Sequence, residues 1–233
     1  MYNSTEKENI EKFIKSTKKE YEAMKKIPRY AIVNNVTRTD GSFTQIGYRP
    51  QLEFDFFDPN SNIAPHIVGL GQQIADGEHK FLIETILKSV TAKTVRENDF
   101  TPAFLIDELR RKISLNVVIL APNKLLTLLD KQNSLVYDAK VRGYVIEVEG
   151  MGVPVYPVRE EFIGTNLIIL SRTDIIWKYV WFGDSTLDIN VNFVPLKGQY
   201  DVIIRSMIKL EFVPKKIIVL NPKNPLHTKP SIF

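Results

Sequence analysis

The sequence predicts an α+β fold, and three observations carry this prediction. An amphipathic pattern near the N-terminus and a long helical pattern over residues 65–93 indicate two helices. Hydrophobic runs of strand length then recur between residues 115 and 221. Short helical patterns separate several of these runs, which is typical of a compact mixed domain. At 233 residues, the chain is long enough for one large or two small domains.

The N-terminal helix opens with a capping box formed by Thr5 and Glu8, and Pro28 ends it. Lysine and glutamate occupy one face, while apolar positions recur on the other at three- and four-residue steps. Two interpretations follow: the helix packs on its own domain, or it is an arm that docks on a neighbour or holds a peptide. The apolar face consists of Ile10, Phe13, Ile14, Thr17, Tyr21 and Met24.

A two-stranded ribbon is predicted next, from residues 30–36 and 47–57. Asp40 and Gly41 supply the turn chemistry between these strands. In the second strand Leu52, Phe54 and Phe56 alternate with polar residues, so one face is apolar. An isolated ribbon is only marginally stable in water, so we expect this one to lie against another part of this chain or against another chain.

A spine helix is predicted over residues 65–93, which is longer than a typical globular helix. After it we expect a helix over residues 103–114, opened by Thr101 and Pro102, and another over 123–131. Strands are predicted at 115–120, 144–148, 153–158, 166–170, 173–182 and 187–194. A final strand pair spans residues 200–221 and turns at Pro214, and the proline-rich tail beyond it is expected to be extended.

Composition narrows the classes of function. The net charge is +4, but basic and acidic residues are interspersed, which is weak support for nucleic-acid binding. No cysteine is present, so disulfides and thiolate metal sites are excluded. No apolar run reaches the length of a membrane span and no signal core is visible, so we expect a protein that stays inside the cell and has no membrane partner.

Few residues form a recognisable chemical constellation. His66, His79 and His227 are not spaced as metal ligands. Asp138, Glu147 and Glu149 could form the acidic cluster of a magnesium-dependent nuclease, because hard cations prefer carboxylate oxygens. The lysine expected on the same strand is absent from VIEVEG, and we favour the interpretation that these residues alternate on the wet face of a strand. We therefore predict no catalytic residue, no metal and no cofactor, and keep the nuclease as the alternative function.

Several segments resemble the Hong Kong 97-type major capsid proteins of tailed phages, and more narrowly the encapsulin shell proteins. These segments are LNVVILAPNKLLTLLDKQ, GVPVYPV through TNLIILSRTDII, GDSTLDINV and FVPKKIIVLNP. The resemblance covers most of residues 26–222 and rests on the order of patterns. It implies a non-enzymatic protein that assembles with itself into an icosahedral shell, in the cytoplasm as a compartment or as a virion, around a cargo protein or packaged nucleic acid. A monomeric binding module is a third possibility.

The resemblance also implies a division of the chain. Residues 1–28 would form an N-arm, 29–62 the E-loop ribbon, 63–100 the P-domain spine helix, 101–192 the A-domain, 193–222 the P-domain return strands and 223–233 an extended tail. Cargo or the inner surface would meet the apolar side of the N-arm at Phe13, Ile14, Tyr21 and Met24. The E-loop would contact a neighbouring subunit through Arg38, Asp40, Gly41 and Phe43.

Overall fold

The computed structural model describes residues 4–25, 43–49, 51–53, 57, 69–112, 116–131, 135–139 and 143–223. These residues divide into two units. The first contains the described residues up to 81 together with 177–210, and the second contains those of 82–176 together with 211–223. Each unit has its own sheet and its own hydrophobic core.

The first unit is built around one long strand, β11 (Gln199–Phe212). Antiparallel to it run β10 (Leu187–Val194), β1 (Thr44–Tyr48) and β2 (Gln51–Glu53), and β9 (Ile175–Tyr179) also pairs with it. The β10–β11 register joins Leu187 to Ser206 and Val194 to Gln199. Along β11 buried and half-buried residues alternate, which is the two-residue period of a strand with one covered face.

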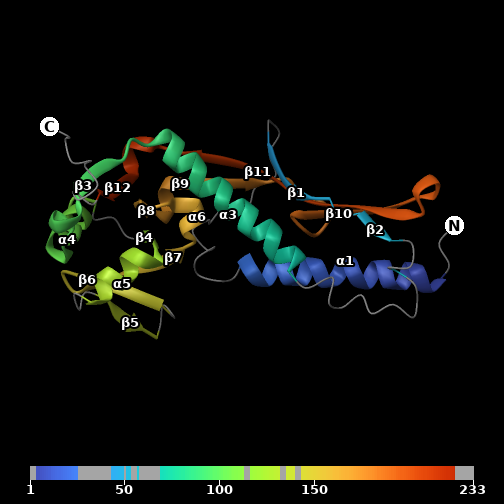
Figure 1. Cartoon of the computed structure of the whole chain (residues 1–233), viewed down its shortest axis with the longest axis horizontal. Helices are drawn as coiled ribbons and strands as arrows, with labels where there is room; N and C mark the ends of the chain where they lie inside the picture. Colours follow the sequence, from blue (N-terminus) through green and yellow to red (C-terminus); the bar gives the residue numbers. More distant parts are fainter. Residues whose placement is uncertain are drawn as a thin grey trace, which may run out of the picture. The chain divides into compact units, whose positions relative to one another are not determined.

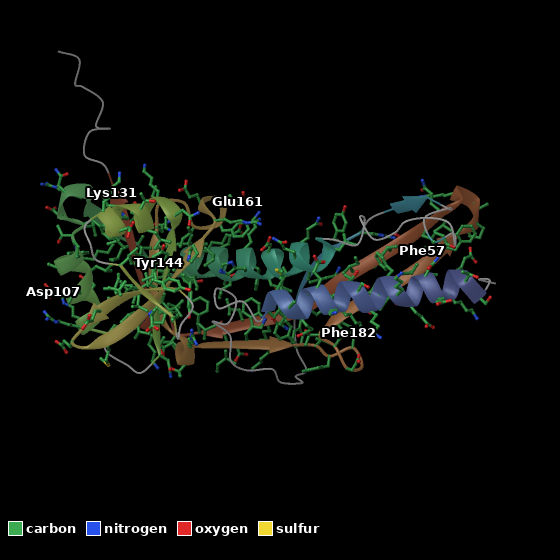
Figure 2. The ribbon with its side chains drawn as sticks, turned by 90° about the horizontal axis from the view of Figure 1, so that it is seen from below. Phe57, Asp107, Lys131, Tyr144, Glu161 and Phe182 are labelled. Atoms are coloured by element: carbon green, nitrogen blue, oxygen red, sulfur yellow. The ribbon has the colours of Figure 1, made fainter. Side chains whose placement is uncertain are left out.

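Helix α1 (Ser4–Lys25) runs along the β10–β11 hairpin (Figure 1). It buries Phe13, Thr17 and Tyr21, a row at four-residue spacing. Phe57 lies between the helix and the sheet, with its ring edge-on to Phe13 at 5.6 Å and to Tyr200 at 4.8 Å between centroids (Figure 2). This aromatic row forms the centre of the unit's core, which α1 therefore completes.

Helix α3 (Leu70–Ser89) begins against α1, and its first turn shows how closely the two helices approach. A Cβ atom added to Gly71 would lie 2.5 Å from the backbone nitrogen of Tyr21 and 2.8 Å from the carbonyl oxygen of Thr17. The Glu20 carboxylate of α1 accepts hydrogen bonds from the backbone N–H groups of Gly69 and Gly71 at 2.7 and 2.9 Å. A negative charge at this position satisfies orphan donors of the helix start and complements its dipole.

The second unit contains a seven-stranded sheet in the order β3-β12-β8-β4-β7-β6-β5. Its strands are β3 (Lys93–Arg96), β4 (Val117–Pro122), β5 (Val136–Asp138), β6 (Gly143–Val148), β7 (Met151–Val158), β8 (Leu167–Ser171) and β12 (Ile218–Lys223). The pairs β3–β12 and β4–β7 are parallel, and the other neighbours are antiparallel. Strand β4 is buried along its whole length, as expected in the middle of a covered sheet.

The helices of the second unit are α4 (Pro102–Arg110), α5 (Asn123–Lys131) and the short α6 (Glu160–Ile163). Thr101 caps α4 by accepting a hydrogen bond from the N–H of Phe104, and Pro102 occupies the first helical position. Leu105, Leu109, Leu125 and Leu129 from α4 and α5 pack into the core with residues of β4, β6 and β8.

The structure corrects several predicted elements. The spine helix is shorter than residues 65–93 because it ends at Ser89, and residue 93 already begins β3. The predicted strand over 47–57 is replaced by β1 and β2. The final strand pair is wrong as a pair, because β11 and β12 join different sheets. The predicted strand over 30–36 and the tail beyond residue 223 lie outside the described residues.

Candidate functional site

The residues predicted for cargo contact on α1 lie against the core of their own unit. Phe13 and Tyr21 are 0% exposed, and the half-buried Ile14 and Met24 pack against the same core. The first of the two interpretations, a helix packed on its own domain, therefore describes Phe13 and Tyr21. A cargo contact stays a prediction, and only Ile14 and Met24 have surface to offer it.

The predicted inter-subunit residues of the E-loop are described only in part. Arg38, Asp40 and Gly41 lie outside the described residues, and Phe43 is half-buried immediately before β1. Strands β1 and β2 are hydrogen-bonded to β11 of the same chain. This part of the ribbon therefore lies against its own unit, which is one of the two positions expected for it.

The three acidic residues of the nuclease alternative do not form a metal site. In the β5–β6–β7 ladder Asp138 pairs with Gly143, whereas Glu147 pairs with Gly152, so they are four positions apart along β6, or about 13 Å. Glu149 accepts a hydrogen bond from Arg110 at 3.0 Å. Within the described ranges no group of three histidine, cysteine, aspartate or glutamate residues could hold a metal ion. The nuclease interpretation therefore has no support.

An exposed aromatic surface lies at the β5 edge of the seven-stranded sheet. Tyr137 is 63% exposed and Tyr144, labelled in Figure 2, is 45% exposed. They pair directly across β5 and β6, with rings edge-on at 6.1 Å. Val136, next to Tyr137 on β5, is also exposed, but it belongs to the opposite face of the sheet. We call Tyr137 and Tyr144 the β5-edge patch; exposed aromatic residues grouped at a sheet edge are typical of an interaction surface.

A second group of residues, inside the first unit, contains a buried carboxylate and a largely buried lysine. Glu78 of α3 is 4% exposed. Its two carboxylate oxygens accept hydrogen bonds from the hydroxyls of Tyr21 at 2.6 Å and Tyr179 at 3.0 Å. Lys25 Nζ donates to the Thr186 hydroxyl at 3.1 Å and lies 4.0 Å above the Tyr179 ring. Together with Ser206 we call these residues the Glu78 cluster.

Burial controls the electrostatics of this cluster. It raises the pKa of Glu78, and the opposing influence of Lys25 and of the hydroxyls around the carboxylate does not cancel that effect. Burial likewise lowers the pKa of Lys25, although Glu78 opposes it. The pKa values of Tyr21 and Tyr179 lie well above 10, because both rings are buried beside the carboxylate. Both tyrosines therefore remain hydrogen-bond donors across the physiological range.

Sequence reasoning missed both the β5-edge patch and the Glu78 cluster. The cluster left a signal: Glu78 occupies the same helical row as Ile74 and Leu82, which are both buried. A carboxylate at the spacing of a buried apolar row indicates a buried partner. Lys25 similarly extends the buried row of α1 by one more step of four.

Comparisons with known proteins agree on the architecture. No family model and no curated protein matches the sequence. Among solved structures, the holo-SrpI encapsulin complex from Synechococcus elongatus superimposes with a TM-score of 0.61 at 14% identity, covering 84% of this chain and 88% of that one. A subunit of a virus-like particle from Pyrococcus furiosus superimposes with a TM-score of 0.57 at 12% identity, covering 91% of this chain and 98% of that one. A chain from the structure of Mycobacterium phage Che8 superimposes with a TM-score of 0.56 at 10% identity, covering 79% of this chain and 76% of that one.

No helix in the described part of the chain is both long and apolar enough to cross a membrane. The α+β architecture, the two sheets and the matches to these particles agree with the resemblance drawn from the sequence. The chain has the Hong Kong 97-type fold that encapsulin and phage capsid subunits share.

Proposed function

We propose that this chain is a structural shell protein whose copies assemble into a closed icosahedral particle, either an encapsulin-type compartment in the cytoplasm or a viral capsid. The observation that carries the proposal is the extent of the structural match. The superpositions run over most of this chain and over 88% of the encapsulin subunit and 98% of the virus-like-particle subunit. A match of that extent covers most of the architecture of each of these two subunits, which supports the same use of the fold here.

The β5-edge patch supports this proposal physically. Tyrosines are enriched at protein interfaces because they bury a large apolar area and keep a polar group for hydrogen bonding. A short edge strand with exposed Val136 and Tyr137 leaves backbone groups and apolar area that a neighbour can cover. Closed symmetric assembly covers the same patch on every copy, which is how homo-oligomers remove such surfaces.

The division drawn from the resemblance is part of the proposal. Residues 29–62 would reach a neighbouring subunit, with Arg38, Asp40, Gly41 and Phe43 at the contact, and residues 101–192 would form the domain near the symmetry axes. Ile14 and Met24 would offer the remaining contact for an enclosed cargo protein. Packaged nucleic acid is the other possible content, held by charge neutralisation rather than by base reading. The role is non-enzymatic.

Electron microscopy of the purified protein in negative stain tests the proposal. We expect uniform hollow particles, and a homogeneous monomer or dimer across salt and pH would overturn the shell. Nuclease digestion and mass spectrometry of the contents would then separate packaged nucleic acid from a protein cargo.

Two substitutions sharpen this experiment. Tyr137→Glu places a charge in the β5-edge patch, and we expect fewer or no particles while circular dichroism stays unchanged. Glu147→Ala is the matched control on neighbouring β6, because Glu147 is exposed and outside the patch. Normal particles from Tyr137→Glu would exclude the patch as a contact between copies without affecting the shell proposal.

A further inference from the structure

The Glu78 cluster joins parts of the first unit that are far apart in the chain. Tyr21 and Lys25 come from the last turns of α1, Glu78 from α3, Tyr179 from β9 and Ser206 from β11, and Thr186 precedes β10. Tyr21 also lies 3.4 Å from the Thr186 hydroxyl. Releasing α1 would therefore break polar contacts as well as the apolar packing of Phe13. This arrangement exists within one copy of the chain and does not depend on assembly.

The cluster places two opposite charges in a buried site without a direct ion pair between them. Lys25 Nζ lies over the ring faces of Tyr21 at 4.9 Å and Tyr179 at 4.0 Å, and the hydroxyls of the same two rings bind the Glu78 carboxylate. Removing two charges from water costs more than an imperfect buried pairing returns. The groups that act on Glu78 are Tyr21 and Lys25 of α1, Tyr179 of β9 and Ser206 of β11. Exposed Glu22 acts on Tyr21 and Lys25, Thr186 lies next to Tyr21, and the buried His79 follows Glu78 on α3.

We propose that the Glu78 cluster is a proton-sensitive clasp for α1, whose hold on the helix is weakest when Glu78 and Lys25 both carry their charges. Neutralising either group removes a buried charge and tightens the contact between α1 and the rest of its unit. The helix is then held most loosely near neutral pH and more firmly on either side of it.

The direction in which docking of α1 changes with pH follows from the linkage between docking and proton binding. With α1 docked, burial raises the pKa of Glu78 above an ordinary 4.5 and outweighs Lys25 and the hydroxyls, which lower it. The docked unit therefore binds the Glu78 proton more tightly than a unit in which release of α1 exposes the carboxylate to water, and docking strengthens as the pH falls through the raised value. Docking lowers the pKa of Lys25 from an ordinary 10.5, so docking strengthens as the pH rises through the lowered value. The tyrosines keep their protons over this whole range, because their pKa values lie well above 10.

A thiol introduced on α1 can report its release, because the chain contains no cysteine. Thr17→Cys places the reporter at a site that is 0% exposed, and the Thr17 hydroxyl makes no hydrogen bond to any described residue. Ala23→Cys gives a matched exposed thiol on the same helix. The ratio of the labelling rate at position 23 to that at position 17 cancels the intrinsic pH dependence of the thiol and measures how firmly α1 is docked.

We expect this ratio to pass through a minimum between the ordinary pKa values of the two groups, 4.5 for Glu78 and 10.5 for Lys25, and to rise on the acid side by about threefold or more. Each unit of pKa shift allows a change of at most about tenfold. The double variant Glu78→Gln, Lys25→Met should flatten the profile, because neither position can then change charge. Tyr179→Phe should move the acid side of the minimum to higher pH, because it removes a hydrogen bond that lowers the pKa of Glu78. A ratio that is constant with pH in the otherwise unchanged chain, or a minimum that persists in the double variant, would overturn the proposal.

Discussion

The contact between α1 and α3 at Gly71 makes a quantitative prediction about stability. In Gly71→Ala the new methyl group would lie 2.5 Å from the Tyr21 backbone nitrogen, 2.8 Å from the Thr17 carbonyl oxygen and 3.0 Å from the Tyr21 Cα. All three atoms belong to the backbone of α1, so no side chain can turn away, and the helices must separate by about 1 Å to restore ordinary contact. Overpacking of this kind costs about 1–3 kcal/mol.

The same displacement weakens the hydrogen bond from Gly71 to Glu20, which adds about 1 kcal/mol, whereas alanine returns at most about 1 kcal/mol of helix propensity. The last two contributions offset one another, so we expect Gly71→Ala to lower the free energy of unfolding by about 1–3 kcal/mol, or the urea midpoint by about 1 M. Tryptophan fluorescence measures this unit selectively, because both tryptophans of the chain, Trp177 and Trp181, belong to it.

Gly77→Ala is the control on the same helix. There the added methyl group would meet only the Cγ2 atom of Ile46, at 2.7 Å, and this half-buried side chain can move. With the helix-propensity gain of about 1 kcal/mol, the net change should stay within about 1 kcal/mol of zero. A Gly71→Ala protein as stable as the unaltered protein, or no less stable than Gly77→Ala, would refute the close approach of the two helices.

Two further predictions concern single side chains. Burial lowers the pKa of Lys112 to about 8; Asp174 opposes this shift and Lys216 adds to it. The rate at which Lys112 is acylated, followed by peptide mass spectrometry, should therefore level off above about pH 8. An ordinary lysine gains reactivity up to about pH 10. A rate that still climbs steeply at pH 10 would contradict this. Glu20→Gln removes the charge that accepts hydrogen bonds at the start of α3, so the urea midpoint should fall by the equivalent of about 1 kcal/mol. The control Glu22→Gln, at an exposed position of the same helix, should change the midpoint little. Equal effects of the two substitutions would argue against a capping role for Glu20.

Local patterns were enough to locate elements whose burial is periodic. The apolar row that predicts the N-terminal helix includes Phe13, Thr17 and Tyr21, the three residues that α1 buries. The segment over 173–182 fits helix and strand equally by periodicity, but its aromatic and branched residues favour a strand, which β9 confirms. In both cases the information lies within a few residues of the element itself.

Pairing partners and buried clusters depend on residues that are distant in the chain. Pro214 ends a strand equally well at a hairpin and at a passage between two sheets, so the turn does not reveal that β12 joins β8 and β3 instead of β11. Glu78 meets a tyrosine 57 residues before it and another 101 residues after it. Sequence periodicity could indicate that Glu78 needs a buried partner, but the fold determines which residues supply it.

The place of β12 in the seven-stranded sheet has a consequence for synthesis of the chain. Residues 218–223 lie between β3 and β8, which have no direct hydrogen-bonded contact with one another in the described ladder. A ribosome delivers β3 more than a hundred residues before the strand that pairs with it. Until β12 emerges, the facing edges of β3 and β8 stay open to other nascent copies, and unpaired edges of this kind are prone to aggregation. This sheet therefore cannot close until β12 has been synthesised, and we expect chaperones to bind the nascent chain during that interval.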